Sequence, residues 1–167
     1  MNKTYLGAAG SILTVEARHS AYIRSTGNKL SPFPSAFDVP LDFDEVYTLA
    51  AAFIASCPSD NPMLPVKAFP SLTADAANPM LPSPGDMVTF DLSSECDLNG
   101  KALYGAWISS TGPVFVPVTI NGGKISAQIP AMGINGQSYF VLTSDGTMVS
   151  DDSVLAGPAV VEVAPAN

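Results

Sequence analysis

Basic residues are scarce in this sequence. Its 167 residues include seven lysines and arginines against fifteen aspartates and glutamates, which gives a formal net charge of −8. No cluster of positive charge occurs anywhere in the chain. Nucleic acids and anionic membrane surfaces attract proteins mainly through such clusters, so neither is expected as a partner. The sequence also lacks the long apolar run that a membrane-spanning helix needs, so no span is predicted.

Charged residues of both signs are few, at 13%, while hydrophobic residues make up 47%. This balance excludes a disordered chain, because enough apolar surface is available to form a core. Nothing near Met1 resembles a signal peptide. If the protein is secreted, we expect its export signal to lie outside these residues.

Only two cysteines are present, Cys57 and Cys96, and their spacing fits no metal-binding or C-x-x-C pattern. Two interpretations stay open. The residues are either two unconnected thiols or a disulfide that joins the end of a helical region to the following domain. The second interpretation fits a secreted protein.

The opening stretch is predicted to form a long helix over residues 2–26. Six of its residues recur at helical spacing and form one stripe: Tyr5, Ala9, Ile12, Glu16, His19 and Ile23. Glu16 and His19 lie three residues apart in this otherwise apolar stripe. A carboxylate and an imidazole in such a place need partners, either a metal ion or a network of hydrogen bonds. Because the only histidine lies here, no Ser/His/Asp triad is predicted.

A shorter helix is predicted over residues 43–56, capped by Asp42 or Asp44 and packed on the first helix. Glu45, in its first turn, is expected to be solvated. Residues 58–84 are predicted to form a proline-rich ordered linker. It repeats the sequence Asn-Pro-Met-Leu-Pro at residues 61–65 and 78–82, and we expect each Met and Leu to pack on neighbours. A recognition segment of polyproline type is the alternative.

The remainder of the chain is predicted to be all β. Seven strands are expected, over residues 87–92, 102–109, 114–120, 124–129, 138–143, 147–150 and 159–163. Trp107 and Tyr139 are interpreted as core aromatics, and Asp151 and Asp152 as a solvated acidic loop. This pattern is typical of an immunoglobulin-like sandwich. The predicted fold class is therefore α+β, with helical residues 1–57, the linker 58–84 and the sandwich 85–167.

The opening helix carries a family resemblance. The stretch GAAGSILTVEARHSAYIR, with the Pro-Phe-Pro connection that follows it, resembles the last bundle helix of fungal ferritin-like proteins. These are secreted or cell-surface proteins of the stress-response and desiccation-related type. The resemblance covers about residues 5–72, and the β-rich half is similar to the extension that such proteins carry. It implies an extracellular or cell-surface location.

The resemblance implies that Glu16 is a bridging ligand and His19 a terminal ligand of a dinuclear iron or manganese centre. A complete centre needs four helices and a second Glu-x-x-His, which this sequence does not contain. The other helices would come from a preceding segment or from another chain, which implies an oligomer or a larger assembly. The chemistry implied is oxidation of bound metal by oxygen or peroxide. The alternative is a non-catalytic structural protein in which the stripe is a subunit interface.

Overall fold

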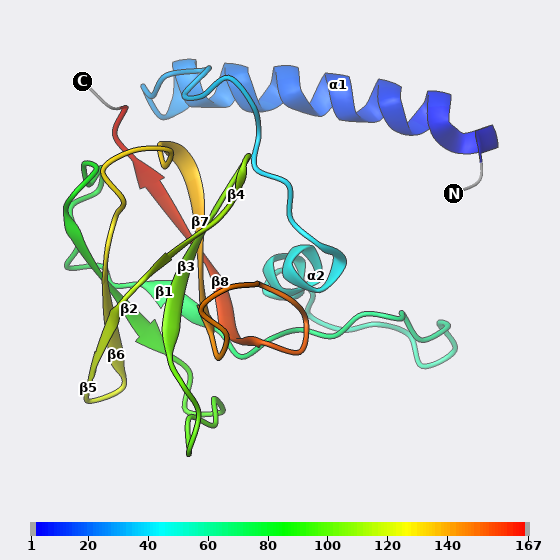
Figure 1. Ribbon diagram of the computed structural model, residues 1–167. Coiled ribbons are helices and arrows are strands. Elements are labelled where there is room, and N and C mark those ends of the chain that lie inside the picture. The colour runs from blue at the N-terminus through cyan, green and yellow to red at the C-terminus, as the bar shows by residue number, and fades with distance from the viewer. Residues whose placement is uncertain (1–2, 166–167) are drawn as a thin grey trace. The chain divides into compact units, whose positions relative to one another are not determined.

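The computed structural model describes residues 3–165 (Figure 1). The chain forms two compact units, Met1–Ala36 and Phe37–Asn167. In the first unit, helical structure is confirmed from residue 3 onward, and residue 2 lies outside the described part. The elements are a 3-10 turn η1 (Lys3–Tyr5), the helix α1 (Leu6–Tyr22) and a π-helical turn η2 (Ile23–Gly27).

This helical region ends at Gly27, one residue beyond the predicted end at residue 26. The amide of Asn28 donates to the carbonyl of Ile23 at 3.0 Å, and that of Leu30 donates to Arg24 at 2.9 Å. The Arg24 Nε atom donates to the Ser31 carbonyl at 2.9 Å. These bonds satisfy carbonyl groups that a helix end leaves without partners, so the chain leaves the helix in a defined direction.

The second unit contains two four-stranded antiparallel sheets (Figure 1). The strands are β1 (Leu72–Ala74), β2 (Met87–Leu92), β3 (Tyr104–Ser109), β4 (Gly112–Val116), β5 (Val118–Asn121), β6 (Lys124–Gln128), β7 (Gly136–Thr143) and β8 (Val154–Val163). Their order is β1-β2-β6-β5 in one sheet and β4-β3-β7-β8 in the other. The predicted α+β class is confirmed.

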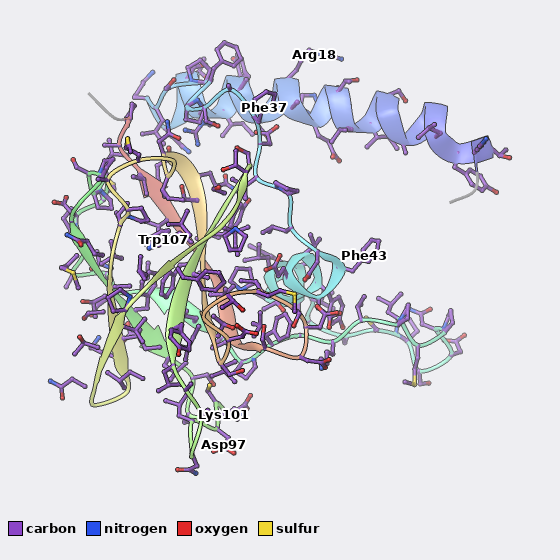
Figure 2. All side chains as sticks on the ribbon, in the orientation of Figure 1. Arg18, Phe37, Phe43, Asp97, Lys101 and Trp107 are labelled. Carbon is purple, nitrogen blue, oxygen red and sulfur yellow. The ribbon has the colours of Figure 1, made fainter. Side chains whose placement is uncertain are left out.

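Three aromatic rings connect the two sheets in the core. Phe90 of β2 stacks on Phe140 of β7, with ring centroids 4.4 Å apart and planes 6° from parallel. The Trp107 ring of β3 lies 5.1 Å from Phe140, and its indole N–H donates to the Gln128 carbonyl at 3.0 Å. All three rings are fully buried, and Trp107 lies among the strands in Figure 2. Gly105 leaves room for them, because a Cβ there would lie 2.6 Å from the Phe140 ring.

The strand predicted over residues 114–120 is in fact two strands in different sheets. Pro117 separates β4 from β5, and the chain crosses from one sheet to the other at this residue. Proline has no N–H to donate to a ladder, so continuous pairing through this position is disfavoured. Valines alternate on both sides of Pro117, so the sequence pattern alone predicts one continuous strand.

Two other strand predictions need correction. Residues 147–150 form a hydrogen-bonded loop rather than a strand, and β8 begins at Val154 instead of residue 159. The segment predicted to be a linker contributes a strand, β1, which pairs with β2. Asn78 extends this pairing, because its side chain accepts from the Thr89 amide at 2.9 Å and donates to the Thr89 carbonyl at 2.6 Å.

The second helix, α2 (Phe43–Ala51), is shorter than predicted. It belongs to the second compact unit and contacts β8, whereas the sequence placed it in the helical region that ends at residue 57. Two hydrogen bonds hold residues 67–69 against α2. Asp44 accepts from the Lys67 amide at 3.1 Å, and Thr48 accepts from the Phe69 amide at 2.9 Å. Phe43, by contrast, points away from the protein (Figure 2).

The two Asn-Pro-Met-Leu-Pro repeats do not pack their methionines as predicted. Met63 is 96% exposed and Met80 is 95% exposed. The first copy lies in a continuously exposed stretch, residues 52–65. The second copy is held on the sheet through Asn78 and through Pro82, whose carbonyl accepts from the Ala164 amide at 2.8 Å.

Candidate functional site

The helix α1 places Glu16 and His19 on one face, three residues apart, as the sequence predicts. Both side chains are exposed, and no residue of α1 is buried. The apolar members of the same face are exposed as well. Ile12 is 54% exposed and Ile23 is 55% exposed, and Leu13, which borders this face, is 68% exposed. Glu16 and His19 therefore lie within an apolar surface that the first compact unit leaves uncovered.

The opposite face of α1 is built from small residues. Gly7, Gly10, Thr14, Ala17 and Ala21 recur at intervals of three and four, and a Cβ at either glycine would meet no atom within 4 Å. Small side chains let the backbone of another helix approach closely. The only ionisable residues between Leu6 and Tyr22 are Glu16, Arg18 and His19. A helix with so little charge on any side is typical of one buried on more than one side.

The described residues do not complete a metal site around Glu16 and His19. Between residues 3 and 165, no group of three or more His, Cys, Asp or Glu side chains could hold a metal ion. One carboxylate and one imidazole supply part of the donor set that a dinuclear centre requires. The remaining ligands would have to come from elsewhere.

The beginning of α2 carries an acidic cluster, and the prediction that Glu45 is solvated is wrong. Glu45, expected to be solvated, is only 3% exposed. It takes part in a capping box, in which Asp42 accepts from the Glu45 amide at 2.8 Å and Glu45 accepts from the Asp42 amide at 2.9 Å. The D-x-x-E spacing of residues 42–45 is the signal that could have identified this role.

The acidic cluster consists of Asp42, Asp44, Glu45 and Asp151, and both burial and repulsion between carboxylates raise pKa values within it. Burial raises the pKa of Glu45 most strongly, the hydrogen bond from the Asp42 amide lowers it, and the nearby charges of Asp42 and Asp151 raise it. Loss of hydration raises the pKa of Asp151, as do the charges of Asp42 and Asp44 and a hydrogen bond with Asp42, while Lys67 lowers it. The loop that carries Asp151 therefore comes close to the first turn of α2.

We expect acidification from pH 7 to pH 4.5 to strengthen this part of the fold. A carboxyl whose pKa is raised on folding contributes stability below its ordinary pKa, 4.5 for Glu45, and loses it as the pH rises through the raised value. Glu45→Gln keeps an acceptor for the Asp42 amide but cannot titrate. The rise in Tm on acidification should therefore be smaller in this variant, measured by circular dichroism in steps of pH.

The control for this experiment is Glu95→Gln, which removes an exposed carboxylate distant in sequence. It should leave the pH dependence of Tm unchanged. The pKa of Asp75 is lowered mainly by a hydrogen bond from Lys124. The stability that this carboxylate contributes is therefore lost only below its ordinary pKa of 3.8, outside the pH range of this experiment. An equal change of Tm with pH in wild type and Glu45→Gln would contradict the predicted contribution of Glu45.

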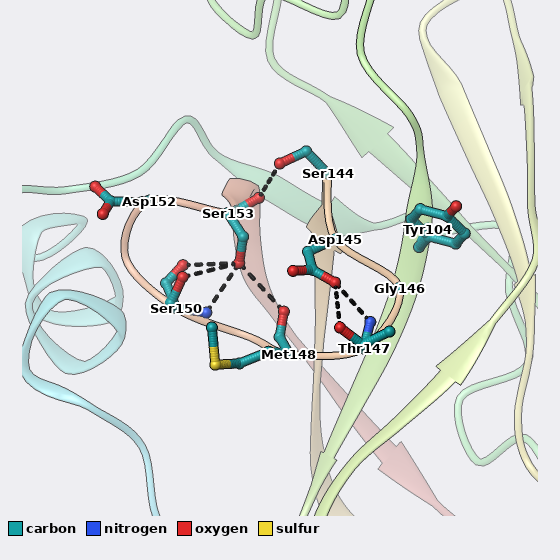
Figure 3. A pocket seen from close by; sticks show the side chains of 9 residues that line it. All are labelled: Tyr104, Ser144, Asp145, Gly146, Thr147, Met148, Ser150, Asp152 and Ser153. Carbon is teal, nitrogen blue, oxygen red and sulfur yellow. Dashed lines mark hydrogen bonds between the residues drawn. The ribbon is translucent and has the colours of Figure 1, made fainter.

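A surface hollow of about 700 Å³ lies over the loop between β7 and β8, beside Tyr104 (Figure 3). Its polar groups bond mainly within the loop. The Asp145 carboxylate accepts from the amide and the hydroxyl of Thr147, both at 2.7 Å, and the Ser153 hydroxyl accepts from the Ser150 amide at 2.9 Å. These bonds fix the shape of the loop. They do not direct several polar groups toward a common point, as a binding site would require.

Both cysteines are free thiols in the structure, as in the first of the two interpretations left open above. Cys57 lies in the exposed segment 52–65, whereas Cys96 is half-buried and its thiol donates to the Leu155 carbonyl at 3.3 Å. Burial raises the pKa of Cys96. The two residues therefore occupy separate chemical environments.

Comparison with known proteins supports the interpretation of the first unit. The family model of the ferritin-like domain matches residues 1–29, which include α1. The match covers the beginning of the chain and does not extend to the β-rich unit. No curated protein matches the sequence significantly. Within residues 3–165, no helix is both long enough and apolar enough to cross a membrane.

Proposed function

We propose that α1 is one helix of a ferritin-like bundle, and that the other helices come from another chain or from a segment outside these 167 residues. The observation that supports this most directly is that α1 has an apolar face and a small-residue face, with no residue of either buried. The ferritin-like match over residues 1–29 supports the same proposal.

The exposed apolar face supplies the driving force for assembly. A contiguous apolar surface on a helix is unfavourable in water, and a helix as short as α1 owes most of its stability to packing. Covering Ile12, Leu13 and Ile23 would remove large apolar groups from water, at about 1.5–3 kcal/mol for each fully buried side chain. Covering both faces requires helices on two sides, as in a bundle.

Glu16 and His19 are the residues that would hold metal in the assembled bundle. A bound iron or manganese pair would supply oxidation chemistry with oxygen or peroxide. The helix α1 offers one carboxylate and one imidazole, which do not by themselves fit a complete dinuclear centre, and the described residues place no further ligands beside them. A purely structural role is therefore the second candidate. It is favoured by the apolar and small residues that make up most of α1.

Native purification followed by size measurement and metal analysis separates the two candidates. Both predict that α1 is covered in the native protein, either by another chain or by a further segment of the same chain, and Ile12→Asp should disrupt this packing. If the bundle binds metal, His19→Ala should leave the assembly intact and lower bound iron or manganese by more than about ten-fold. The matched control, Arg18→Ala, changes the next residue on the opposite face and should retain the metal.

Two results would reject parts of this proposal. A natively purified protein in which α1 is stable and stays uncovered would reject the bundle altogether. An assembled protein with no iron, manganese, zinc or copper above trace would reject the metal site and leave the structural role. The first result concerns the apolar face, and the second concerns only Glu16 and His19.

We also propose that the second unit is an immunoglobulin-like sandwich. The strand order β1-β2-β6-β5 and β4-β3-β7-β8 corresponds to the order A-B-E-D and C′-C-F-G of that fold. Trp107 lies on the strand that corresponds to C, where the fold typically places its core tryptophan. Phe90 and Phe140 lie on the strands that correspond to B and F, which carry a disulfide in antibody domains. An extracellular location, which the family resemblance implies, is likewise proposed.

A further inference from the structure

Every methionine that the structure describes is exposed. The exposed fractions are 96% for Met63, 95% for Met80, 83% for Met132, 58% for Met148 and 55% for Met87. Methionine is normally among the residues found most often inside proteins. The core of the second unit instead consists of aromatic, branched aliphatic and alanine side chains. The thioethers are thus separated from the packing that holds the fold together.

The repeated Asn-Pro-Met-Leu-Pro sequence presents its methionine in the same way in two different settings. The first copy, residues 61–65, is exposed throughout, whereas the second copy, residues 78–82, is fixed to the sheet by Asn78 and the buried Pro82. Yet Met63 and Met80 differ by only one percentage point in exposure. Proline on both sides of each Met-Leu pair restricts the backbone of both copies. The motif itself therefore accounts for the exposure better than the local fold does.

We infer that these surface methionines are reversible oxidation sites for peroxide. Each thioether would take one oxygen atom from hydrogen peroxide, forming a sulfoxide and releasing water. The sulfur is oxidised by two electrons, and the peroxide bond is broken and reduced. A sulfoxide is more polar than a thioether, which disrupts a core but is tolerated on a surface. Because the core described above contains no methionine, oxidation leaves it unchanged.

Peroxide treatment of the full chain, followed by peptide mapping, tests this inference. Cys57→Ser is used as background so that the exposed thiol does not consume oxidant. The five described methionines should gain about 80 Da together, about 16 Da for each sulfoxide. Met63 and Met80 should react first and at similar rates, followed by Met132 and then by Met148 and Met87. Methionine sulfoxide reductases acting on both epimers should reverse the gain.

The fully oxidised protein should keep its near-ultraviolet circular dichroism, and its Tm should change by less than about 3 °C. Met63→Leu with Met80→Leu should remove the two fastest reactions and leave the rates of the other three unchanged. A loss of tertiary structure during oxidation would overturn the inference. Protection of Met63 or Met80 in the natively purified protein would also overturn it, because the residue would then be covered by a partner. Neither outcome depends on the proposed role of α1.

Discussion

Phe140→Ala is expected to lower the free energy of unfolding of the β-rich unit by about 3–5 kcal/mol. The Phe140 ring is fully buried and contacts the rings of both Phe90 and Trp107, which belong to different sheets. Its removal leaves a cavity at the point where the sheets meet. The surrounding strands cannot close this cavity without disturbing two ladders.

The measurement is urea unfolding followed by far-ultraviolet circular dichroism, because fluorescence from Trp107 would change with its neighbour. The matched control is Phe53→Ala, which removes the same ring from a side chain that is 91% exposed. The control should change the free energy of unfolding by no more than about 0.5 kcal/mol. Similar values for the two variants would show that the ring cluster does not hold the sheets together.

Gly157→Ala is expected to cost at least about 3 kcal/mol, as the sum of backbone strain and steric overlap. Gly157, in β8, has φ of 108°. A Cβ there would lie 2.9 Å from the Phe140 carbonyl oxygen and 3.2 Å from the Val141 Cα. Both neighbours are backbone atoms of β7, so no side-chain rotation can relieve the overlap.

Gly85→Ala is the control that separates these two effects. Gly85 has φ of 92°, but a Cβ there would meet nothing within 4 Å. It should therefore show only the strain, about 1–2 kcal/mol, in the same urea experiment. If the two variants were equally stable, the close approach of β7 to Gly157 would not contribute to stability.

The sequence predicts the elements with strong local patterns. Spacing and alternation predict helical structure over residues 2–26 and a strand over residues 87–92, and the structure confirms the helix over residues 3–26 and the strand over residues 87–92. The burial of Trp107 is confirmed as well. Local pattern fails where tertiary contacts decide. The strand at Leu72–Ala74 has a weak pattern of its own and exists because β2 offers it a free edge.

In the candidate site, too, local spacing predicts some features, while others depend on tertiary contacts. The spacing of Glu16 and His19 predicts that they share a helical face, and the helix is present. Spacing alone cannot supply ligands that lie on other helices, so the metal site stays a prediction. Glu45 shows the opposite error. Its charge predicted solvation, but the capping box and the approach of the Asp151 loop bury it.

The stacked Phe90 and Phe140 rings have a consequence for the unfolded chain. A disulfide between two sheets would persist after unfolding and would restrict the denatured ensemble. The ring pair acts only in the folded state, so the denatured chain keeps its full conformational freedom. Its contribution also does not depend on the thiol–disulfide potential of the surroundings. The contact between the two sheets at these rings is therefore stabilised without any thiol chemistry.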